Sequence, residues 1–233
     1  MQLFEHQLAA IEKLSSGKIL CGGVGTGKSL TALGYYYIKI CGGSINPFTE
    51  MINKIPLYII TTARKRDTEE WSAECLKMHI FENVTVDSWN NIAKYANVKN
   101  AFFIFDEQRV VGYGTWVKNF FKICRENRWI LLTATPGDTW TDYMPVFIAN
   151  GFYKNKTEFI DRHVVYDMYS SYPRIKYYVN TDYLVKLKEK IMVNMYYEKH
   201  ATAHEIYISS DYNESLYKTT QKELYNPFKK EKN

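Results

Sequence analysis

The sequence predicts an α/β fold in which helices cover both faces of a parallel β-sheet. Apolar runs of strand length alternate with helical segments to about residue 150, an order typical of parallel sheets. The runs over residues 101–105 and 129–132 are apolar throughout, as expected of strands buried on both faces. The first run, residues 19–21, leads into a glycine-rich turn that opens a helix.

The composition is that of an ordinary globular protein. The 233 residues, 46% hydrophobic and 24% charged, can form one full core with an appendage or two small domains. The net charge of +5 permits nucleic-acid binding without requiring it, because a solvated lysine-rich surface gives the same excess. The four cysteines are too widely spread for a zinc ribbon or a disulfide framework. No signal-like start or long apolar stretch is present, so we expect a cytoplasmic protein with no membrane partner.

The pattern of expected elements changes after about residue 150. Before it, helices are expected over residues 4–15, 30–40, 115–127 and 140–150, with others starting near Asp67 and Ser88, and strands over 19–21, 57–61, 83–87, 101–105 and 129–132. Residues 44–56 are polar and irregular, which favours a surface loop. Beyond residue 150, helices are expected over 157–165, 183–191 and 212–224, with short strands over 175–179 and 204–209. We therefore divide the chain into residues 1–155 and a small α+β extension, residues 156–233.

Residues 22–29, Gly-Gly-Val-Gly-Thr-Gly-Lys-Ser, fit a phosphate-binding loop. Gly22, Gly25 and Gly27 can adopt positive φ, which lets main-chain N–H groups point at phosphate oxygens near a helix N-terminus. Lys28 would bridge the β- and γ-phosphates, and the Ser29 hydroxyl would hold magnesium. The predicted nucleotide ligands in this loop are Gly22, Gly25, Thr26, Gly27, Lys28 and Ser29. The alternative is a glycine turn that only joins a strand to a helix.

Asp106 and Glu107 follow the buried strand of residues 101–105. Two carboxylates at the tip of such a strand require a cation or solvent. Beside a phosphate loop, Asp106 would coordinate magnesium and Glu107 would orient and deprotonate the attacking water. The predicted catalytic residues are therefore Lys28, Asp106 and Glu107.

Polar residues at other strand ends and at one helix are further candidates. Gln7 can read the edge of an adenine or be an exposed helix residue. Thr61, Thr62 and Arg64 follow a strand, where they can hold a phosphate backbone or form a solvated basic loop. Trp89 can stack on a base or belong to the core. Thr133 and Thr135 end another strand, where their hydroxyls can bond to the catalytic carboxylates.

Together these segments resemble the first motor domain of superfamily 2 helicases and translocases, in the branch that includes the SWI/SNF-type remodelling ATPases. The matching segments are residues 3–7 (the adenine-reading glutamine motif), 22–29 (Walker A), 61–64 (motif Ia), 87–89 (a further nucleic-acid motif), 106–109 (the Asp-Glu-x-His box) and 133–135 (motif III). Residues 131–159 look most similar to the helicases carried in the replication modules of tailed bacteriophages.

The resemblance implies a RecA-like P-loop NTPase domain that uses ATP and Mg²⁺ to move on DNA during phage replication or recombination. It implies DNA contacts through Thr61, Thr62, Arg64 and Ser88, and coupling roles for Thr133 and Thr135. Arg109 replaces the usual His of the fourth box position, which puts its coupling role in doubt. A phage-encoded protein would act in the host bacterial cytoplasm.

The family's arginine-containing motif VI is not found downstream of Tyr183. Such an arginine contributes about 10³ to 10⁵ in rate in related hydrolases. We therefore expect ATP binding with slow hydrolysis, and a second RecA-like domain on another polypeptide, or other replication proteins, as partners. The alternative is a non-catalytic, ATP-gated module that binds DNA or a partner. A small-molecule kinase would leave residues 61–64 and 133–135 unexplained.

Overall fold

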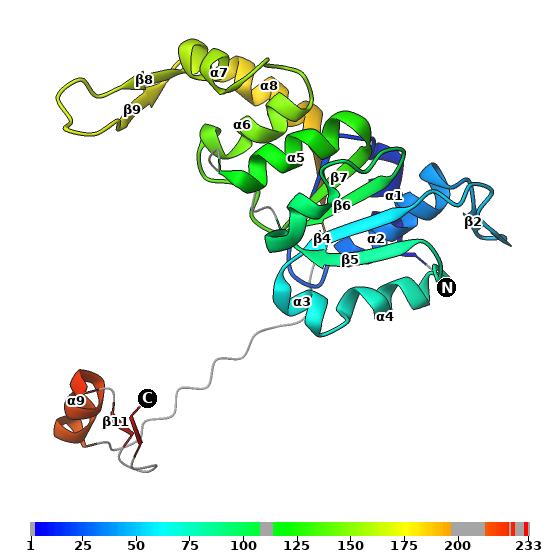
Figure 1. Cartoon of the computed structure of the whole chain (residues 1–233), viewed down its shortest axis with the longest axis horizontal. Helices are drawn as coiled ribbons and strands as arrows, with labels where there is room; N and C mark the ends of the chain where they lie inside the picture. Colours follow the sequence, from blue (N-terminus) through cyan, green and yellow to red (C-terminus); the bar gives the residue numbers. More distant parts are fainter. Residues whose placement is uncertain (1–2, 108–113, 197–212, 224, 227–230, 233) are drawn as a thin grey trace. The chain divides into compact units, whose positions relative to one another are not determined.

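The computed structural model describes residues 3–107, 114–196, 213–223, 225–226 and 231–232. Residues 1–197 form one compact unit and residues 198–233 form another. The first unit contains a six-stranded parallel sheet in the order β10-β1-β7-β6-β4-β5 (Figure 1). The strands are β1 (Ile19–Gly22), β4 (Leu57–Thr61), β5 (Val84–Ser88), β6 (Phe102–Asp106), β7 (Arg128–Thr133) and β10 (Met192–Met195).

Alternating side chains of the central strands enter two separate hydrophobic cores. In β6 every position is buried, and Phe102 and Ile104 join one core whereas Phe103 and Phe105 join the other. This arrangement follows from the two-residue period of a strand whose two faces are both covered. The predicted α/β class, with helices over both faces of a parallel sheet, is confirmed.

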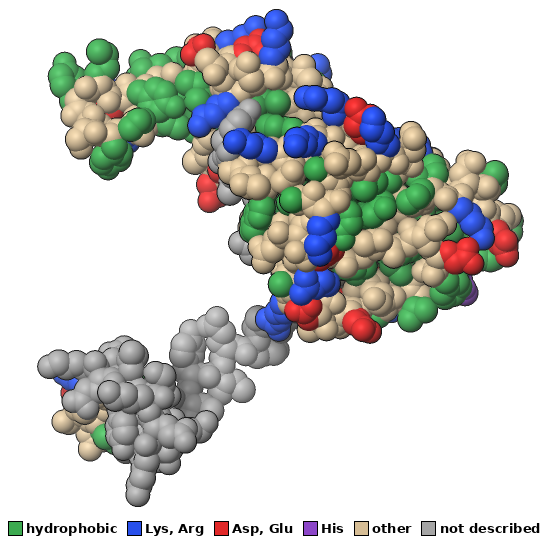
Figure 2. All heavy atoms as spheres, in the orientation of Figure 1, with side chains coloured by type: hydrophobic (Ala, Val, Ile, Leu, Met, Phe, Trp, Pro, Cys, Tyr) green, Lys and Arg blue, Asp and Glu red, His purple; other side chains and the backbone are tan. Residues whose placement is uncertain are grey.

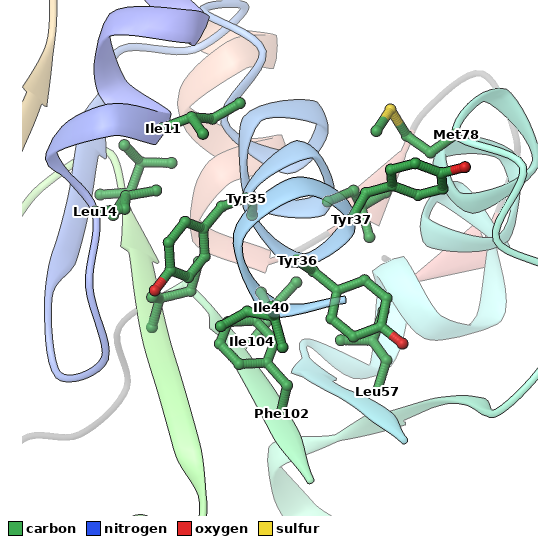
Figure 3. Close-up of a cluster of buried hydrophobic side chains, with 14 of the residues drawn as sticks. Ile11, Leu14, Tyr35, Tyr36, Tyr37, Ile40, Leu57, Met78, Phe102 and Ile104 are labelled. Carbon is green, nitrogen blue, oxygen red and sulfur yellow. The ribbon is translucent and has the colours of Figure 1, made fainter. Parts of the chain in front are cut away.

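Helices from the first third of the chain cover one face of the sheet. They are α1 (Glu5–Lys13), α2 (Lys28–Tyr35), the π-helical turn η1 (Tyr36–Ile40) and α4 (Glu70–Lys77). Figure 3 shows Tyr35, Tyr36 and Tyr37 fanning out from the junction of α2 and η1. The rings of Tyr35 and Tyr36 each lie 5.8 Å from that of Phe102, so this aromatic cluster fastens α2 to the middle of the sheet.

Later helices cover the other face. They are η2 (Trp89–Tyr95, a 3₁₀ helix), α5 (Thr115–Glu126), α6 (Trp140–Ala149), α7 (Lys156–His163) and α8 (Thr181–Ile191). The short helix α3 (Ala63–Asp67) buries no residue and follows β4 directly. A hairpin of β8 (Val164–Tyr166) and β9 (Ile175–Tyr178) projects from the α7 end of the unit (Figure 1).

Three predicted elements differ in the structure. Residues 44–56 contain a hairpin of β2 (Ser44–Ile45) and β3 (Phe48–Thr49), because the Tyr37 hydroxyl donates to the Thr49 carbonyl and anchors it. The helix expected near Asp67 is split into α3 and α4, since Glu69 has a φ of 55° between them. The helix expected over residues 30–40 changes to π-helical geometry after Tyr35.

The compact unit continues past the domain boundary predicted after residue 155. Strand β10 lies at an edge of the sheet, beside β1, with Gly22 in register with Met195. The sequence did not predict this strand. The unit of residues 198–233 contains α9 (Glu214–Glu223), β11 (Tyr225–Asn226) and β12 (Glu231–Lys232). The strand predicted over residues 204–209 lies outside the described residues.

Candidate functional site

Most of the predicted site residues lie at or just after the carboxyl ends of the parallel strands, which all lie along the same side of the sheet. Strands β1 and β6, which carry the glycine loop and the acid pair, flank β7. Asp106 is in register with Leu132 of β7, and Thr133 is in register with Cys21 of β1. Ligands of α/β sheets bind outside such strand ends, so this edge is the candidate site.

Two glycines of the loop have the positive φ that a phosphate-binding loop uses. Gly25 and Gly27 have φ values of 82° and 78°, and Gly27 caps the N-terminus of α2. Gly22 instead lies within β1 and does not adopt the positive φ that glycine permits. A Cβ at Gly22 would lie 2.7 Å from the Thr26 Oγ1, so space is what requires glycine there.

The Lys28 ammonium is folded onto its own loop. Its Nζ donates to the carbonyl oxygens of Gly22 at 2.7 Å and Gly23 at 2.9 Å. Burial lowers the Lys28 pKa; the charge of Asp106 opposes that shift, and the charge of Lys65 adds to it. Asp106 and Lys65 are therefore close enough to act on Lys28. The loop lysine follows β1 and the strand-end acid ends β6, so both lie at the carboxyl ends of the strands that flank β7.

Asp106 is only 3% exposed, and its carboxylate is fixed by three donors. Its Oδ2 accepts hydrogen bonds from Thr61 Oγ1 at 2.8 Å, Lys65 Nζ at 3.0 Å and Trp71 Nε1 at 3.0 Å. Its Oδ1 accepts no hydrogen bond from the residues that the structure describes. Trp89, which is buried, donates its Nε1–H to the Asp106 carbonyl at 3.0 Å. Of the two predictions for Trp89, the core residue is the one observed.

Lys65 joins the two acids and was missed by the sequence prediction. Its Nζ lies 3.0 Å from Asp106 Oδ2 and 3.0 Å from Glu107 Oε1. Burial lowers the pKa of Lys65, but the two carboxylates outweigh it and the pKa is raised. Glu107 itself has a φ of 57°, which turns the chain directly after β6. The sequence signal was the cationic run of residues 64–66, but nothing local indicated that β4 pairs with β6.

A cavity of about 260 Å³ lies between the start of α2 and α4. It is lined by Ser29, Lys65, Glu70, Trp71, Ala73 and Glu74. Ser29 and Lys65 therefore open onto the same space, and Lys65 also touches both acids. A serine hydroxyl and a carboxylate oxygen that accepts no hydrogen bond from the described residues are hard oxygen donors of the kind that Mg²⁺ prefers. Ser29 and Asp106 Oδ1 thus fit the predicted metal role.

Gln7 is buried rather than exposed, with a relative exposure of 2%. Its Oε1 accepts from the Phe4 N–H at 2.9 Å, and its Nε2 lies 3.5 Å from the Gly27 carbonyl oxygen. The ring of His6 contacts the Thr26 carbonyl at 3.2 Å. The start of α1 is therefore tied to the glycine loop through these polar side chains. Adenine reading by Gln7 stays a prediction.

Three of the four predicted DNA contacts gather beside the acid pair. Thr61, Thr62 and Ser88 line a hollow of about 190 Å³ together with Ala63, Trp89, Asn90 and Trp116. Arg64 is exposed on α3 and does not line this hollow. Trp116 was not predicted, because a tryptophan in the first turn of a helix carries no signal of its own. Its ring lies 6.3 Å from that of Trp89.

Asp87 organises the chain next to this hollow. Its carboxylate accepts hydrogen bonds from the Ser88 N–H, Asn91 Nδ2, Tyr95 Oη and Arg66 Nη1. Burial raises the pKa of Asp87, but these four donors outweigh it and lower the pKa to about 2. Arg66 also donates to the Ser88 hydroxyl at 3.3 Å. The carboxylate thus fixes the position of Ser88.

The predicted coupling residues are only partly described. The Thr133 hydroxyl donates to the Thr135 carbonyl at 2.8 Å and accepts the Thr135 N–H at 3.1 Å. It therefore closes its own turn, and the expected bonds from these hydroxyls to the acids are made by Thr61, Lys65 and Trp71 instead. Arg109 lies outside the described residues.

Comparisons with known proteins identify no family for this chain. No family model matches it, and no curated protein matches it. Among the solved structures that it resembles is the Pyrococcus furiosus Hef helicase domain, with a TM-score of 0.41 and 18% identity over 63% of this chain. Another is the large terminase ATPase domain of a Thermus phage, with a TM-score of 0.44 and 13% identity over 62% of this chain. The match covers 35% of the Hef chain and 69% of the terminase domain.

Proposed function

We propose that this chain is the ATP-binding motor domain of a DNA helicase or translocase, and that it hydrolyses ATP with Mg²⁺. The observation that carries the proposal is the meeting of two halves at one sheet edge. Lys28 and Ser29 begin α2 after β1, and Asp106 ends β6 two strands away, with Glu107 directly after it. A lysine-serine loop and an acid pair at the same strand ends can hold a nucleoside triphosphate and a metal ion between them.

Each residue of the site would have a distinct role. Lys28 would exchange the carbonyls of Gly22 and Gly23 for phosphate oxygens, which carry more negative charge. Ser29 and Asp106 would hold the metal ion, which supplies positive charge at the phosphates. Glu107 would orient a water molecule and accept its proton.

The proposed DNA contacts lie on the same edge, beyond the acids. Thr61 donates to Asp106 and also lines the hollow of Thr62 and Ser88, so the two regions share a side chain. Hydroxyls and the exposed Arg64 would contact backbone phosphates, giving salt-dependent binding with little sequence preference. We further propose that a second motor domain completes the site and that the setting is phage replication or recombination. The resemblance of residues 131–159 to helicases of phage replication modules supports this setting.

The test is ATP hydrolysis by the full chain, measured with and without DNA and with a candidate second motor domain. We expect Glu107→Gln to keep nucleotide binding and to lose about 10²-fold or more in rate, the contribution of a general base. Glu82→Gln is the control, because Glu82 is an exposed carboxylate that pairs with Lys54 and lines neither the cavity nor the hollow of the site. An unchanged rate in Glu107→Gln would refute the base assignment.

A second outcome would favour a different class of protein. If the wild-type chain binds nucleotide but hydrolyses it in no combination with DNA or a second domain, the chain is an ATP-gated binding module. Nucleotide-dependent DNA affinity would then remain, and Lys28→Ala would abolish that dependence.

A further inference from the structure

The hairpin of β8 and β9 is firmly joined to the compact unit. At its base, the Val179 N–H donates to the His163 carbonyl at 2.9 Å, and the His163 ring contacts the Val179 carbonyl at 3.0 Å. His163 is buried and bonds to the Tyr153 hydroxyl at 2.8 Å. The Tyr178 hydroxyl lies 3.2 Å from that of Thr141 on α6. The hairpin is therefore a fixed projection.

The loop at the tip of the hairpin is also ordered by its own backbone. The Asp167 N–H donates to the Arg174 carbonyl at 2.8 Å, and the Ser170 N–H donates to the Asp167 carbonyl at 3.4 Å. The Asp167 carboxylate accepts the Tyr169 N–H at 3.1 Å. These bonds set the positions from which the loop side chains extend.

Large side chains on this hairpin point into solvent. Met168 is 93% exposed, Tyr169 97% and Tyr172 64%, and Tyr166 and Tyr177 are also exposed. Figure 2 shows these hydrophobic side chains gathered along the projecting hairpin. Elsewhere in the unit, consecutive tyrosines such as Tyr36 and Tyr37 are buried. Exposed apolar clusters of this kind mark interaction surfaces, because they contribute nothing to the core.

The charges between these rings are mainly positive. Arg174 and Lys176 lie between Tyr172 and Tyr177 in the sequence, and Asp167 is the one acid of residues 164–178. Its carboxylate is engaged within the loop. Aromatic rings interleaved with cations complement a polyanion whose bases are accessible, which describes a single strand of nucleic acid. In a duplex the base faces are stacked on one another and out of reach.

We propose that the hairpin, residues 164–178, binds single-stranded nucleic acid: bases stack on Tyr169 and Tyr172, and Arg174 and Lys176 contact phosphates. The choice of nucleic acid as partner rests on the proposed function. The site itself is distinct from the hollow of Thr61, Thr62 and Ser88, because none of residues 164–178 lines that hollow.

The test measures fluorescence anisotropy of the full chain with three labelled probes: oligo-dT, the same backbone with abasic residues, and a duplex. Tyr169→Ala with Tyr172→Ala should weaken oligo-dT binding about 30-fold or more and leave abasic binding unchanged, because only stacking is lost. Changing both tyrosines to Phe should restore oligo-dT binding. Arg174→Ala with Lys176→Ala should weaken binding of both single strands and reduce the salt slope by about 1.4, that is about 0.7 for each phosphate.

Phe81→Ala is the control, since Phe81 is an exposed aromatic residue on the loop before β5 and should leave all binding unchanged. The variants should keep the wild-type Tm, because their side chains are exposed. If the double tyrosine variant binds oligo-dT as the wild type does, or loses duplex and abasic binding equally, the stacking proposal is wrong.

The two proposals fail in different ways. Loss of hydrolysis in every combination, with hairpin variants still losing oligo-dT binding, would refute the motor and leave the hairpin site standing. Normal DNA-stimulated hydrolysis, abolished by Glu107→Gln, with unchanged oligo-dT binding in the hairpin variants would refute the hairpin site alone. In that case the exposed tyrosines serve contacts other than stacking on a single strand.

Discussion

The two halves of the candidate site are held in different ways. In the phosphate half, residues 22–29, the shape of the loop is set by its backbone. Gly25 and Gly27 adopt positive φ, and Lys28 donates to neutral carbonyl oxygens. In the acid half, Asp106 and Glu107 are held mainly by charge, because Lys65 pairs with both carboxylates. Two neutral donors also form hydrogen bonds to the Asp106 carboxylate. The phosphate half is a preformed loop whose cation, Lys28, bonds to neutral carbonyl oxygens. The acid half is a partly buried ion cluster in which two carboxylates share one ammonium.

This difference determines what a nucleotide would have to displace. Lys28 would leave two carbonyl oxygens for phosphates and would gain charge-assisted bonds. A metal ion at Asp106 would instead meet the Lys65 ammonium, which already lies beside the same carboxylate. Two cations on one carboxylate repel each other. We therefore expect the phosphate half to dominate nucleotide affinity and the acid half to dominate the stability of the free protein.

The largest expected effect concerns the phosphate half. Lys28→Ala should weaken nucleotide binding about 100-fold, or about 2.7 kcal/mol, because charged hydrogen bonds to phosphate are lost. The Tm of the free protein should change little, because only bonds to Gly22 and Gly23 are lost. Titration with a fluorescent nucleotide and a thermal melt measure the two effects. A large fall in Tm with unchanged nucleotide affinity would reverse the comparison.

The next effect concerns the acid half. Lys65→Met removes the cation from a buried carboxylate and should cost about 2 kcal/mol in the free protein, less than for a fully buried pair because Lys65 is partly exposed. Added Mg²⁺ with nucleotide should then stabilise the variant more than the wild type, since no ammonium competes for Asp106. Urea unfolding with and without Mg²⁺ and ADP measures both effects.

Lys77→Met is the matched control for Lys65→Met. Lys77 pairs with Glu74 on α4, where the lysine is exposed, so its loss should cost less than about 0.5 kcal/mol. It should also leave the stabilisation by Mg²⁺ and ADP unchanged. Equal stabilisation of Lys65→Met and the wild type would show that Lys65 and the metal ion do not compete.

The phosphate-loop motif can be predicted from the sequence because its signal is local. The strand, the glycine turn and the helix are consecutive in the chain. The apolar composition of β6 and β7 was enough to predict them as buried strands. The contacts that hold the acid half are made between segments distant in the sequence. Thr61, Lys65 and Trp71 reach Asp106 because β4 pairs with β6, and strand order cannot be read from apolar runs. The edge strand β10, four residues directly after α8, is likewise defined by its pairing with β1.

The same distinction explains the corrections within the site. Positive φ at Gly25 and Gly27 follows from the loop motif, whereas the requirement at Gly22 comes from the Thr26 side chain packed against it. Gln7 was expected to read adenine or to be exposed, and its burial depends on how α1 packs on α2. Contacts between distant segments were the part that the sequence left open.

The smallest expected effect concerns Asp87, which fixes the hollow beside the acid half. Its pKa is lowered to about 2 in the folded protein, against an ordinary value of about 4. Its contribution to stability is therefore present above pH 4 and is lost as the pH falls toward 2. Asp87→Asn should cost about 1–2 kcal/mol at pH 7, because charged acceptors of four donors are replaced by a neutral one.

Urea unfolding of Asp87→Asn and the wild type at pH 7, 5, 4 and 3 measures this dependence. The gap between the two proteins should be constant from pH 7 to about pH 5 and should narrow below pH 4, where the wild-type carboxylate begins to lose its advantage. Asp67→Asn is the control, since Asp67 also pairs with Arg66 but is exposed, and it should cost less than about 0.5 kcal/mol at every pH. A gap that stayed constant down to pH 3 would mean that the charge of Asp87 does not hold Ser88 in place. The hollow would then depend on packing of Trp89 and not on this ion cluster.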